Sequence, residues 1–408
     1  MSVRHLFEQP FPVADGCLQV GGVPLPRLAA RVGRTPFYAV ARALLKHRVG
    51  ALRAALPAGI ELHYAVKANP MPALVGHLAG LVDGFDVASG GELKVALDAG
   101  MDPARISFAG PGKGEGELAQ AVAAGILVNI ESPREVPILA AISRSLGLPA
   151  RVAVRVNPDF ELKSSGMKMG GGPKPFGVDA EAVPALLGEI GAAGLAFEGF
   201  HIFSGSQNLK PESICEAQRQ ALELAVRLAG SAPAPVRVLN IGGGFGIPYF
   251  PGEAALDLAP IGDNLRALQA RAAELLPAAT LVLELGRYIV GEAGIYVCRV
   301  VDRKVSRGQV YLVTDGGLHH HLAASGNFGQ VIRKNYPVAI GNRMGDAATE
   351  TPCVVGPLCT PLDLLADRLP LPAAVPGDLV VIFQSGAYGP SASPQGFLSH
   401  PGVVEVLV

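Results

Sequence analysis

The sequence lacks the features that would place a protein in a membrane, on an export route or on a charged polymer. No apolar run in its 408 residues reaches the ~20 residues that cross a bilayer. The segment from Met1 to Gly16 is polar and interrupted by proline, without the apolar core of an export signal. The net charge is only −1, and no block of basic residues stands out. We therefore expect neither nucleic acid nor membrane among its partners.

Cysteine is scarce and shows no pairing pattern. The spacing CxxC is absent, and the five cysteines are odd in number and scattered: Cys17, Cys215, Cys298, Cys353 and Cys359. Neither a disulfide framework nor a structural zinc site is expected from this pattern. It favours a reducing compartment, the cytoplasm.

Apolar residues, in contrast, are abundant. They make up 49% of the sequence against 17% charged residues, which excludes a disordered chain and predicts a large core. Glycine and proline are frequent but follow no repeating period, so a collagen-like chain is excluded. The length suits two to three domains, or one α/β barrel of ~250 residues with a smaller partner domain.

Between residues 37 and 286, short β-rich runs alternate with longer stretches of helical period, such as Gly91–Ala99, Ala180–Ala192 and Ser213–Leu228. The β-rich runs are Leu62–Val66, Gly84–Val87, Ile106–Phe108, Ile126–Ile130, Val152–Val156, Phe197–Ile202, Val236–Leu239 and Leu281–Leu283. Eight strands alternating with helices over about 250 residues predict an α/β fold, a closed (β/α)8 TIM-like barrel. Periodicity alone also allows a doubly wound open sheet.

After residue 287 the pattern changes to strand-like runs joined by glycine and proline turns. These runs are Ile295–Arg303, Val310–Thr314, Pro352–Val355, Asp378–Phe383 and Val403–Val408. They predict a second, antiparallel β domain. We expect residues 1–36 to contribute to this β domain, residues 37–286 to form the barrel, and residues 287–408 to form the C-terminal β domain.

Lys67 stands where functional groups of a parallel barrel gather, at the carboxyl end of a strand. It closes the run His63-Tyr64-Ala65-Val66. Desolvation there would lower the pKa of its amine and make it a nucleophile, as a Schiff-base lysine requires. The alternative is an ordinary solvated lysine at a strand exit.

The glycine-rich loop Gly242-Gly243-Gly244-Phe245-Gly246 follows the seventh run. Backbone N–H groups can converge where side chains are absent, which makes a cradle suited to a phosphate. The spacing is not the GxGxxG of dinucleotide binding. A tight barrel turn is the alternative interpretation.

Other polar residues at strand ends allow a functional and a structural interpretation alike. They are Asp86, Arg155, His201, Glu284 and Arg287. Glu284 and Arg287 could pair with each other, and His201 could be a hydrogen-bonded core histidine. Further along, Cys359 could be a plain buried cysteine. The run His319–His321 predicts no metal site, because consecutive strand residues point to alternating faces and cannot all bind one ion.

Taken together, these motifs resemble the fold type III, pyridoxal-phosphate-dependent decarboxylases, the family of diaminopimelate, ornithine and arginine decarboxylases. The matching segments are Tyr64–Asn69, Asp86–Leu93, His201–Ser206, the glycine-rich loop, Glu284–Arg287, Gly356–Cys359 and Ala387–Gly389. They appear in family order and span nearly the whole chain. The resemblance implies an alanine racemase-like architecture, with a barrel and a β domain.

The resemblance also implies pyridoxal 5'-phosphate as cofactor and a role for each matched residue. Lys67 would hold the cofactor covalently, Glu284 would keep the pyridine nitrogen protonated, and His201 would stack on the ring. Asp86 and Arg155 would line the inner site. The phosphate would be held by Ser204, Gly243, Gly244, Phe245, Arg287 and Tyr388. Cys359 would come from the partner subunit of a homodimer with shared active sites and return a proton after carbon dioxide leaves.

The departures from the family concern the substrate. Diaminopimelate and ornithine enzymes carry an acid after the cysteine for the substrate's distal amine, whereas this chain has Thr360, with Asp363 as the nearest acid. The segment Asp315–Tyr336 is also longer. It resembles the subgroup beside exosortase systems and enzymes that decarboxylate an aminoacyl group on a carrier protein. Candidate substrate contacts are Arg287, Arg333, Tyr336, Thr360 and Tyr388, of which Arg333 could meet a distal carboxylate or another anion.

The resemblance predicts decarboxylation of a free α-amino acid, or of an aminoacyl group on a carrier. An amino-acid racemase on the same fold is one alternative, but alanine racemase resembles neither the segment ending in Cys359 nor His201. A non-catalytic pyridoxal-phosphate carrier is the other. Known carriers resemble the barrel alone, whereas this chain retains the second domain.

Overall fold

The computed structural model describes residues 10–160, 167–168 and 170–408. These residues form two compact units. The first combines Arg48–Ile247 with Ala255–Tyr288, and the second combines the chain up to His47 with Pro248–Ala254 and Ile289–Val408. The sequence-based boundaries at residues 36/37 and 286/287 stay predictions.

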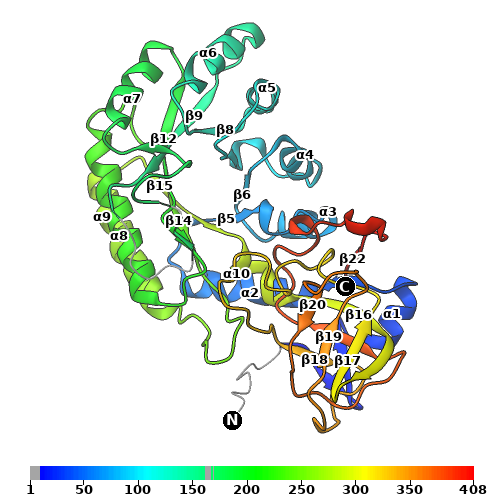
Figure 1. Cartoon of the computed structure of the whole chain (residues 1–408). Coiled ribbons are helices and arrows are strands. Elements are labelled where there is room, and N and C mark those ends of the chain that lie inside the picture. Colours follow the sequence, from blue (N-terminus) through cyan, green and yellow to red (C-terminus); the bar gives the residue numbers. More distant parts are fainter. Residues whose placement is uncertain (1–9, 161–166, 169) are drawn as a thin grey trace. The chain divides into compact units, whose positions relative to one another are not determined.

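The first unit is a closed barrel of parallel strands (Figure 1). Closure is shown by two pairings: the eighth strand pairs with the first, and the fourth with the fifth. Its strands are β5 (Glu61–Ala65), β6 (Gly84–Val87), β7 (Ile106–Phe108), β8 (Leu127–Ile130), β9 (Arg151–Asn157), β12 (Ala196–Ile202), β14 (Val238–Gly243) and β15 (Thr280–Leu285). All eight predicted strands are confirmed, and the open sheet is excluded. A two-residue strand, β11 (Val178–Asp179), pairs parallel with the end of β9, at Val156 and Asn157.

Helices follow the barrel strands, as expected for right-handed βαβ units. They are α3 (Pro72–Leu78), α4 (Gly90–Asp98), α5 (Glu115–Ala124), α6 (Glu135–Leu146), α7 (Val183–Ala192), α8 (Pro211–Ala229) and α9 (Ala259–Leu275), with α2 (Arg42–Ala55) before the first strand. Local sequence features explain where two of these helices begin. Ser89 caps α4 by accepting a hydrogen bond from the Glu92 N–H, and Pro184 stands in the first turn of α7. The three predicted helices are confirmed within a few residues.

The second unit is built on a mixed sheet, in the order β18-β21-β16-β17-β19-β20, with β4 joining β16 to β22. Its strands are β4 (Phe37–Val40), β16 (Gly294–Ser306), β17 (Gln309–Thr314), β18 (Val338–Ile340), β19 (Cys353–Val355), β20 (Leu364–Ala366), β21 (Leu379–Ile382) and β22 (Val404–Leu407). The prediction of a purely antiparallel domain is wrong, because β17 pairs parallel with β19 and β4 pairs parallel with β22. Parallel neighbours need long connections, and local patterns cannot show which distant strands meet.

Residues 11–32 pack into the second unit. A small sheet of β1 (Val13–Ala14), β2 (Cys17–Val20) and β3 (Val23–Pro24) leads into α1 (Leu25–Val32). Their buried side chains, such as Leu18 and Leu28, share one apolar cluster with Val297 and Val381 of the mixed sheet. Within the described part of the chain, no helix combines the length and apolarity needed to span a membrane.

Candidate active site

Three of the predicted site residues meet at the carboxyl ends of the barrel strands. Lys67 lies in a single 3-10 turn, Val66–Ala68, directly after β5, and its Nζ is 3.2 Å from Glu284 Oε1. His201, near the end of β12, places Nε2 3.1 Å from Glu284 Oε2. Each oxygen of one buried carboxylate therefore faces a different nitrogen, and the three side chains come from the turn after β5, from β12 and from β15.

The charge of this trio is set by burial and by ion pairing. The Glu284 side chain is only 5% exposed, which by itself disfavours its charged form. The Lys67 ammonium and His201 outweigh this penalty and hold the pKa of Glu284 well below its usual range. The carboxylate is therefore charged at neutral pH. The Lys67 side chain is 44% exposed, so its amine is open to a reaction partner.

The glycine-rich loop fills a space that admits no side chain. A Cβ at Gly243 would lie 2.2 Å from the Glu284 carbonyl oxygen, and one at Gly244 would lie 2.3 Å from the Gly205 carbonyl oxygen. Gly244 also has a φ of +72°, which favours glycine. The Asn208 N–H donates to the Gly244 carbonyl at 2.9 Å, which ties the loop to the chain after β12. The loop is thus a tight turn packed closely against neighbouring backbone.

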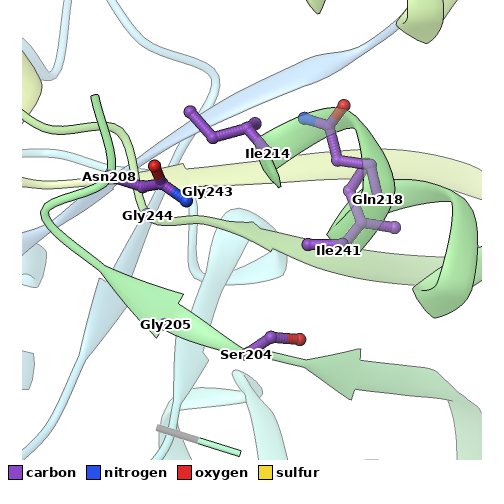
Figure 2. Close-up of a pocket in the computed structure, with 9 residues that line it drawn as sticks. Ser204, Gly205, Asn208, Ile214, Gln218, Ile241, Gly243 and Gly244 are labelled. Carbon is purple, nitrogen blue, oxygen red and sulfur yellow. The ribbon is translucent and has the colours of Figure 1, made fainter. Parts of the chain in front are cut away.

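Figure 2 shows the pocket beside this loop. Ser204, Gly243 and Gly244, all predicted to hold a phosphate, line it together with Asn208 and Gln218. A hydroxyl, two glycines and two amides give an anion several donors without a carboxylate in the lining. Phe245, within this loop, is buried and packs edge-on against Tyr288, with 5.6 Å between ring centroids. Arg287 opens the short helix α10 (Arg287–Val290) directly after β15 and is partly buried.

Asp86 and Arg155 are both buried, but each has its own partner. Asp86 Oδ1 accepts a hydrogen bond from the Ser107 hydroxyl and lies 3.4 Å from His63 Nδ1. Arg155 donates to Glu131 Oε1 at 3.0 Å. Glu131 also accepts from the backbone N–H of Gly110 and Gly177. His63 and Glu131 were missed by the sequence reasoning, although His63 stands four residues before Lys67 and would share its face under strand alternation.

The remaining predicted site residues lie in the second unit. Cys359 is exposed, and Thr360 is half-buried with its hydroxyl near the Leu362 N–H. Tyr336 is buried against Tyr249, with 4.8 Å between ring centroids. Tyr388 is partly buried, 6.3 Å from the ring of Phe328.

Arg333 and Asp363 have structural partners there. Arg333 donates to the carbonyl oxygens of Ser325 and Leu364 and to the side-chain oxygen of Asn335. Three of its five N–H groups are thus engaged. Asp363 is 3% exposed and accepts the N–H groups of Leu318 and Leu358, one on each oxygen. Asp363 therefore holds two loops of its own domain together.

The three consecutive histidines lie on a turn and not on the strand assumed above. Each has a different environment. His320 Nε2 is 2.8 Å from the Pro401 carbonyl, His321 Nε2 is 2.9 Å from the Ser385 hydroxyl, and His319 stacks on His320 with 3.7 Å between centroids. Burial lowers the pKa of His321 to about 3 and that of His319 to about 4, so both are neutral.

The barrel, with a lysine and a glutamate meeting at its strand ends, can be compared with known proteins. A family model described as pyridoxal-dependent decarboxylase, pyridoxal binding domain, matches residues 42–291. The chain belongs to the pyridoxal-dependent decarboxylases. Pyridoxal phosphate is accordingly its cofactor, and amino-acid decarboxylation is its class of reaction.

Two curated relatives and one solved structure illustrate the range of this decarboxylase family. The L-glutamyl-(BtrI acyl-carrier protein) decarboxylase of Niallia circulans is 38% identical over 91% of this chain and 88% of its own length. The diaminopimelate decarboxylase of Aquifex aeolicus is 35% identical over 97% of this chain and 91% of its own. The crystal structure of diaminopimelate decarboxylase from Helicobacter pylori with L-lysine covers 94% of each chain at 28% identity, with a TM-score of 0.81.

Proposed function

We propose that this decarboxylase acts on an α-amino acid unit whose distal end is not a free ammonium group, with an aminoacyl group on a carrier protein as the leading candidate. The proposal rests on the two backbone hydrogen bonds that Asp363 accepts. Thr360 replaces the acid expected after the cysteine, and Asp363, the nearest acid in the sequence, already has both oxygens on backbone N–H groups. The 38% identity with a carrier-protein decarboxylase supports the same substrate class.

The described residues fit pyridoxal phosphate. Gly243 and Gly244 line the pocket, both lie too close to neighbouring backbone to carry a Cβ, and Ser204 adds a hydroxyl beside them. We assign the phosphate to Ser204, Gly243, Gly244, Phe245, Arg287 and Tyr388. When bound, the cofactor supplies an electron sink for the carbanion that loss of carbon dioxide leaves on the substrate.

The chain's own residues would perform the remaining work. Lys67 would bind the cofactor covalently through its exposed amine. Glu284, kept charged by its surroundings, would hold a proton on the pyridine nitrogen, with His201 against the ring. Asp86 and Arg155 would line the inner site. Arg287, Arg333, Tyr336, Thr360 and Tyr388 are proposed substrate contacts, with two N–H groups of Arg333 left for this purpose.

We further propose a homodimer with shared active sites, in which Cys359 protonates the substrate carbon bound to the partner subunit. Three exposed apolar side chains in the segments around Arg333 and Cys359 support an interface: Val331 is fully exposed, Ile332 is 77% exposed and Leu362 is 59% exposed. Hydrogen bonds from Asn327 to Leu362 and from Arg333 to Leu364 tie the two segments together. Apolar surface of this kind marks protein contact sites. Five free cysteines also support a cytoplasmic location.

The deciding experiment measures carbon dioxide release from a panel of free amino acids and of aminoacyl groups on carrier proteins. Release from a carrier-linked substrate, with weak release from free diamino acids, is expected. Efficient release from free meso-diaminopimelate would support the second candidate, a diaminopimelate decarboxylase, which the 35% identity over nearly the whole chain favours. Interconversion of enantiomers without carbon dioxide release would instead indicate a racemase.

A further inference from the structure

A chain of polar side chains crosses the inside of the barrel over four neighbouring strands. Asn129 on β8 donates to the Ser107 hydroxyl on β7 at 3.2 Å, and Ser107 donates to Asp86 Oδ1 on β6. His63 Nδ1 on β5 approaches the same Oδ1 at 3.4 Å. All four side chains are buried. A barrel interior is normally filled by branched apolar residues, so this polar chain departs from the usual packing.

His63 has space because of the residue paired with it. In the β5–β6 register His63 stands opposite Gly84, and a Cβ at Gly84 would lie 2.5 Å from His63 Nε2. The imidazole therefore occupies the volume that a side chain at position 84 would take. On its other side, Glu61 Oε2 is 3.5 Å from His63 Nε2. The ring thus lies between two carboxylates, Asp86 and Glu61.

The surroundings favour the charged form of this histidine. Burial works against the charge, but Asp86 and Glu61 outweigh it and raise the pKa of His63 to about 9. Other charged groups also lie around it. Glu284 is its register partner on β15, and Arg105 and Asp83 act on Glu61. At neutral pH His63 is an imidazolium that offers a proton to Asp86.

Asp86 is held on one oxygen only. Oδ1 accepts a hydrogen bond from Ser107 and lies next to His63 Nδ1. The buried Oδ2 has no hydrogen-bond partner among the described residues. Asp86 pairs in register with Ala65, two residues before Lys67. A buried carboxylate oxygen without a donor is costly unless a donor arrives from elsewhere. Such an oxygen next to the cofactor lysine is a ready acceptor.

We propose that His63 is a positioning residue, which holds Asp86 in an orientation that lets Oδ2 accept a hydrogen bond from the pyridoxal phosphate group bound at Lys67. This role rests on the proposed cofactor contact of Asp86. His63 touches neither cofactor nor substrate in this arrangement. It acts only through the carboxylate that it holds.

The pairing is tested in the full-length protein by NMR titration of the histidine side chains. The His63 signal is the one that disappears in His63→Gln, and it should titrate near pH 9 in the wild type. In Asp86→Asn its pKa should fall by one unit or more. A His63 signal that titrates at the same pH in wild type and Asp86→Asn would overturn the proposal.

The role toward the cofactor is tested by the dissociation constant for pyridoxal phosphate. His63→Gln and Asp86→Asn should each weaken binding by roughly tenfold or more. The double variant should be no weaker than Asp86→Asn alone, because His63 acts through Asp86. The exposed His47→Gln is the matched control and should bind like the wild type. If the losses of affinity in the two single variants add up in the double variant, His63 acts independently of Asp86 and the inference is refuted.

A second variant covers the case in which His63→Gln fails to fold. Glu61→Gln leaves Asp86 untouched but removes one of the two carboxylates beside the ring, so it should lower the pKa of His63 and weaken cofactor binding at alkaline pH. Unchanged affinity across pH would contradict the proposal. A wild type that takes up no pyridoxal phosphate would instead refute the proposed function, and with it the cofactor role of Asp86. Normal loading of the wild type with normal affinity in His63→Gln would refute this inference alone.

Discussion

Lys67 Nζ lies 3.2 Å from Glu284 Oε1, although the two residues are 217 positions apart in the sequence. The closure of the barrel brings them together, because β5 and β15 are hydrogen-bonded neighbours and Glu284 is paired with His63. One carboxylate at the last strand thus faces the lysine at the first.

The covalent role of Lys67 can be tested by borohydride reduction followed by peptide mapping. The label should fall on Lys67, and Lys67→Ala should lower activity by roughly a thousandfold or more, because the group that bonds the cofactor is lost. The fold should stay intact, since the side chain is 44% exposed and contributes little to the core. Lys94→Ala, at a lysine that is 69% exposed on α4, is the matched control and should retain full activity. A pyridoxyl label on another lysine would contradict the assignment.

Shared active sites can be tested by mixing two inactive variants. Lys67→Ala and Cys359→Ala homodimers should each be nearly inactive, but subunit exchange should restore activity. Random pairing yields about half heterodimers with one intact site of two, so recovery should approach about a quarter of the wild-type rate. If exchange is confirmed by native mass spectrometry and no activity returns, Cys359 acts within its own chain or has no catalytic role.

Free basic diamino acids should be poor substrates. A distal ammonium entering a closed site loses hydration, and the Thr360 hydroxyl offers no charge in return. A missing charge partner typically costs ~3–5 kcal/mol, about two to three orders of magnitude in rate or affinity. Thr360→Glu should raise kcat/KM for at least one of meso-diaminopimelate, L-ornithine and L-lysine, whereas the neutral Thr360→Gln should not. Efficient turnover of these amino acids by the wild type would refute the prediction.

The glycine-rich loop should not tolerate a methyl group. Gly243→Ala places a Cβ 2.2 Å from a backbone oxygen, so we expect a loss of stability of about 1–3 kcal/mol together with weaker cofactor binding. Gly188→Ala, on the exposed face of α7 with open space around it, should instead be neutral or stabilising by up to ~1 kcal/mol. Urea unfolding measures the first effect and cofactor titration the second. Equal stability of the two variants would show that the loop can rearrange.

The buried His63 should make the free energy of unfolding fall with rising pH. Its pKa is about 9 in the folded protein against ~6.5 in the unfolded chain, so the folded state binds the proton more tightly. The resulting stabilisation, roughly 3 kcal/mol, is fully present below pH ~6.5 and is lost as the pH rises through about 9. The lowered pKa of Glu284 has the opposite effect on the free energy of unfolding. Its contribution to stability is lost as the pH falls, and only in acid.

Urea unfolding from about pH 6 to about pH 10 checks the alkaline loss of stability. Asp86→Asn should have a flatter profile over this range than the wild type. Profiles of the same slope would show that another group is responsible.

The sequence by itself determined the barrel strands and the main site residues. A period of two over short runs is a local property, so all eight strands could be placed, and Lys67, His201 and Glu284 stand at or near their carboxyl ends. The glycine-rich loop was also readable, because only glycine permits such close backbone approach.

Only the tertiary structure decided which distant groups meet. The parallel pairing of β17 with β19 made the second sheet mixed, both oxygens of Asp363 were engaged by backbone N–H groups, and Gly84 made room for His63 beside Asp86. Each of these includes a contact between residues at least 20 positions apart. Local periodicity carries no information on such contacts, because it records which face a residue occupies and not which partner lies opposite.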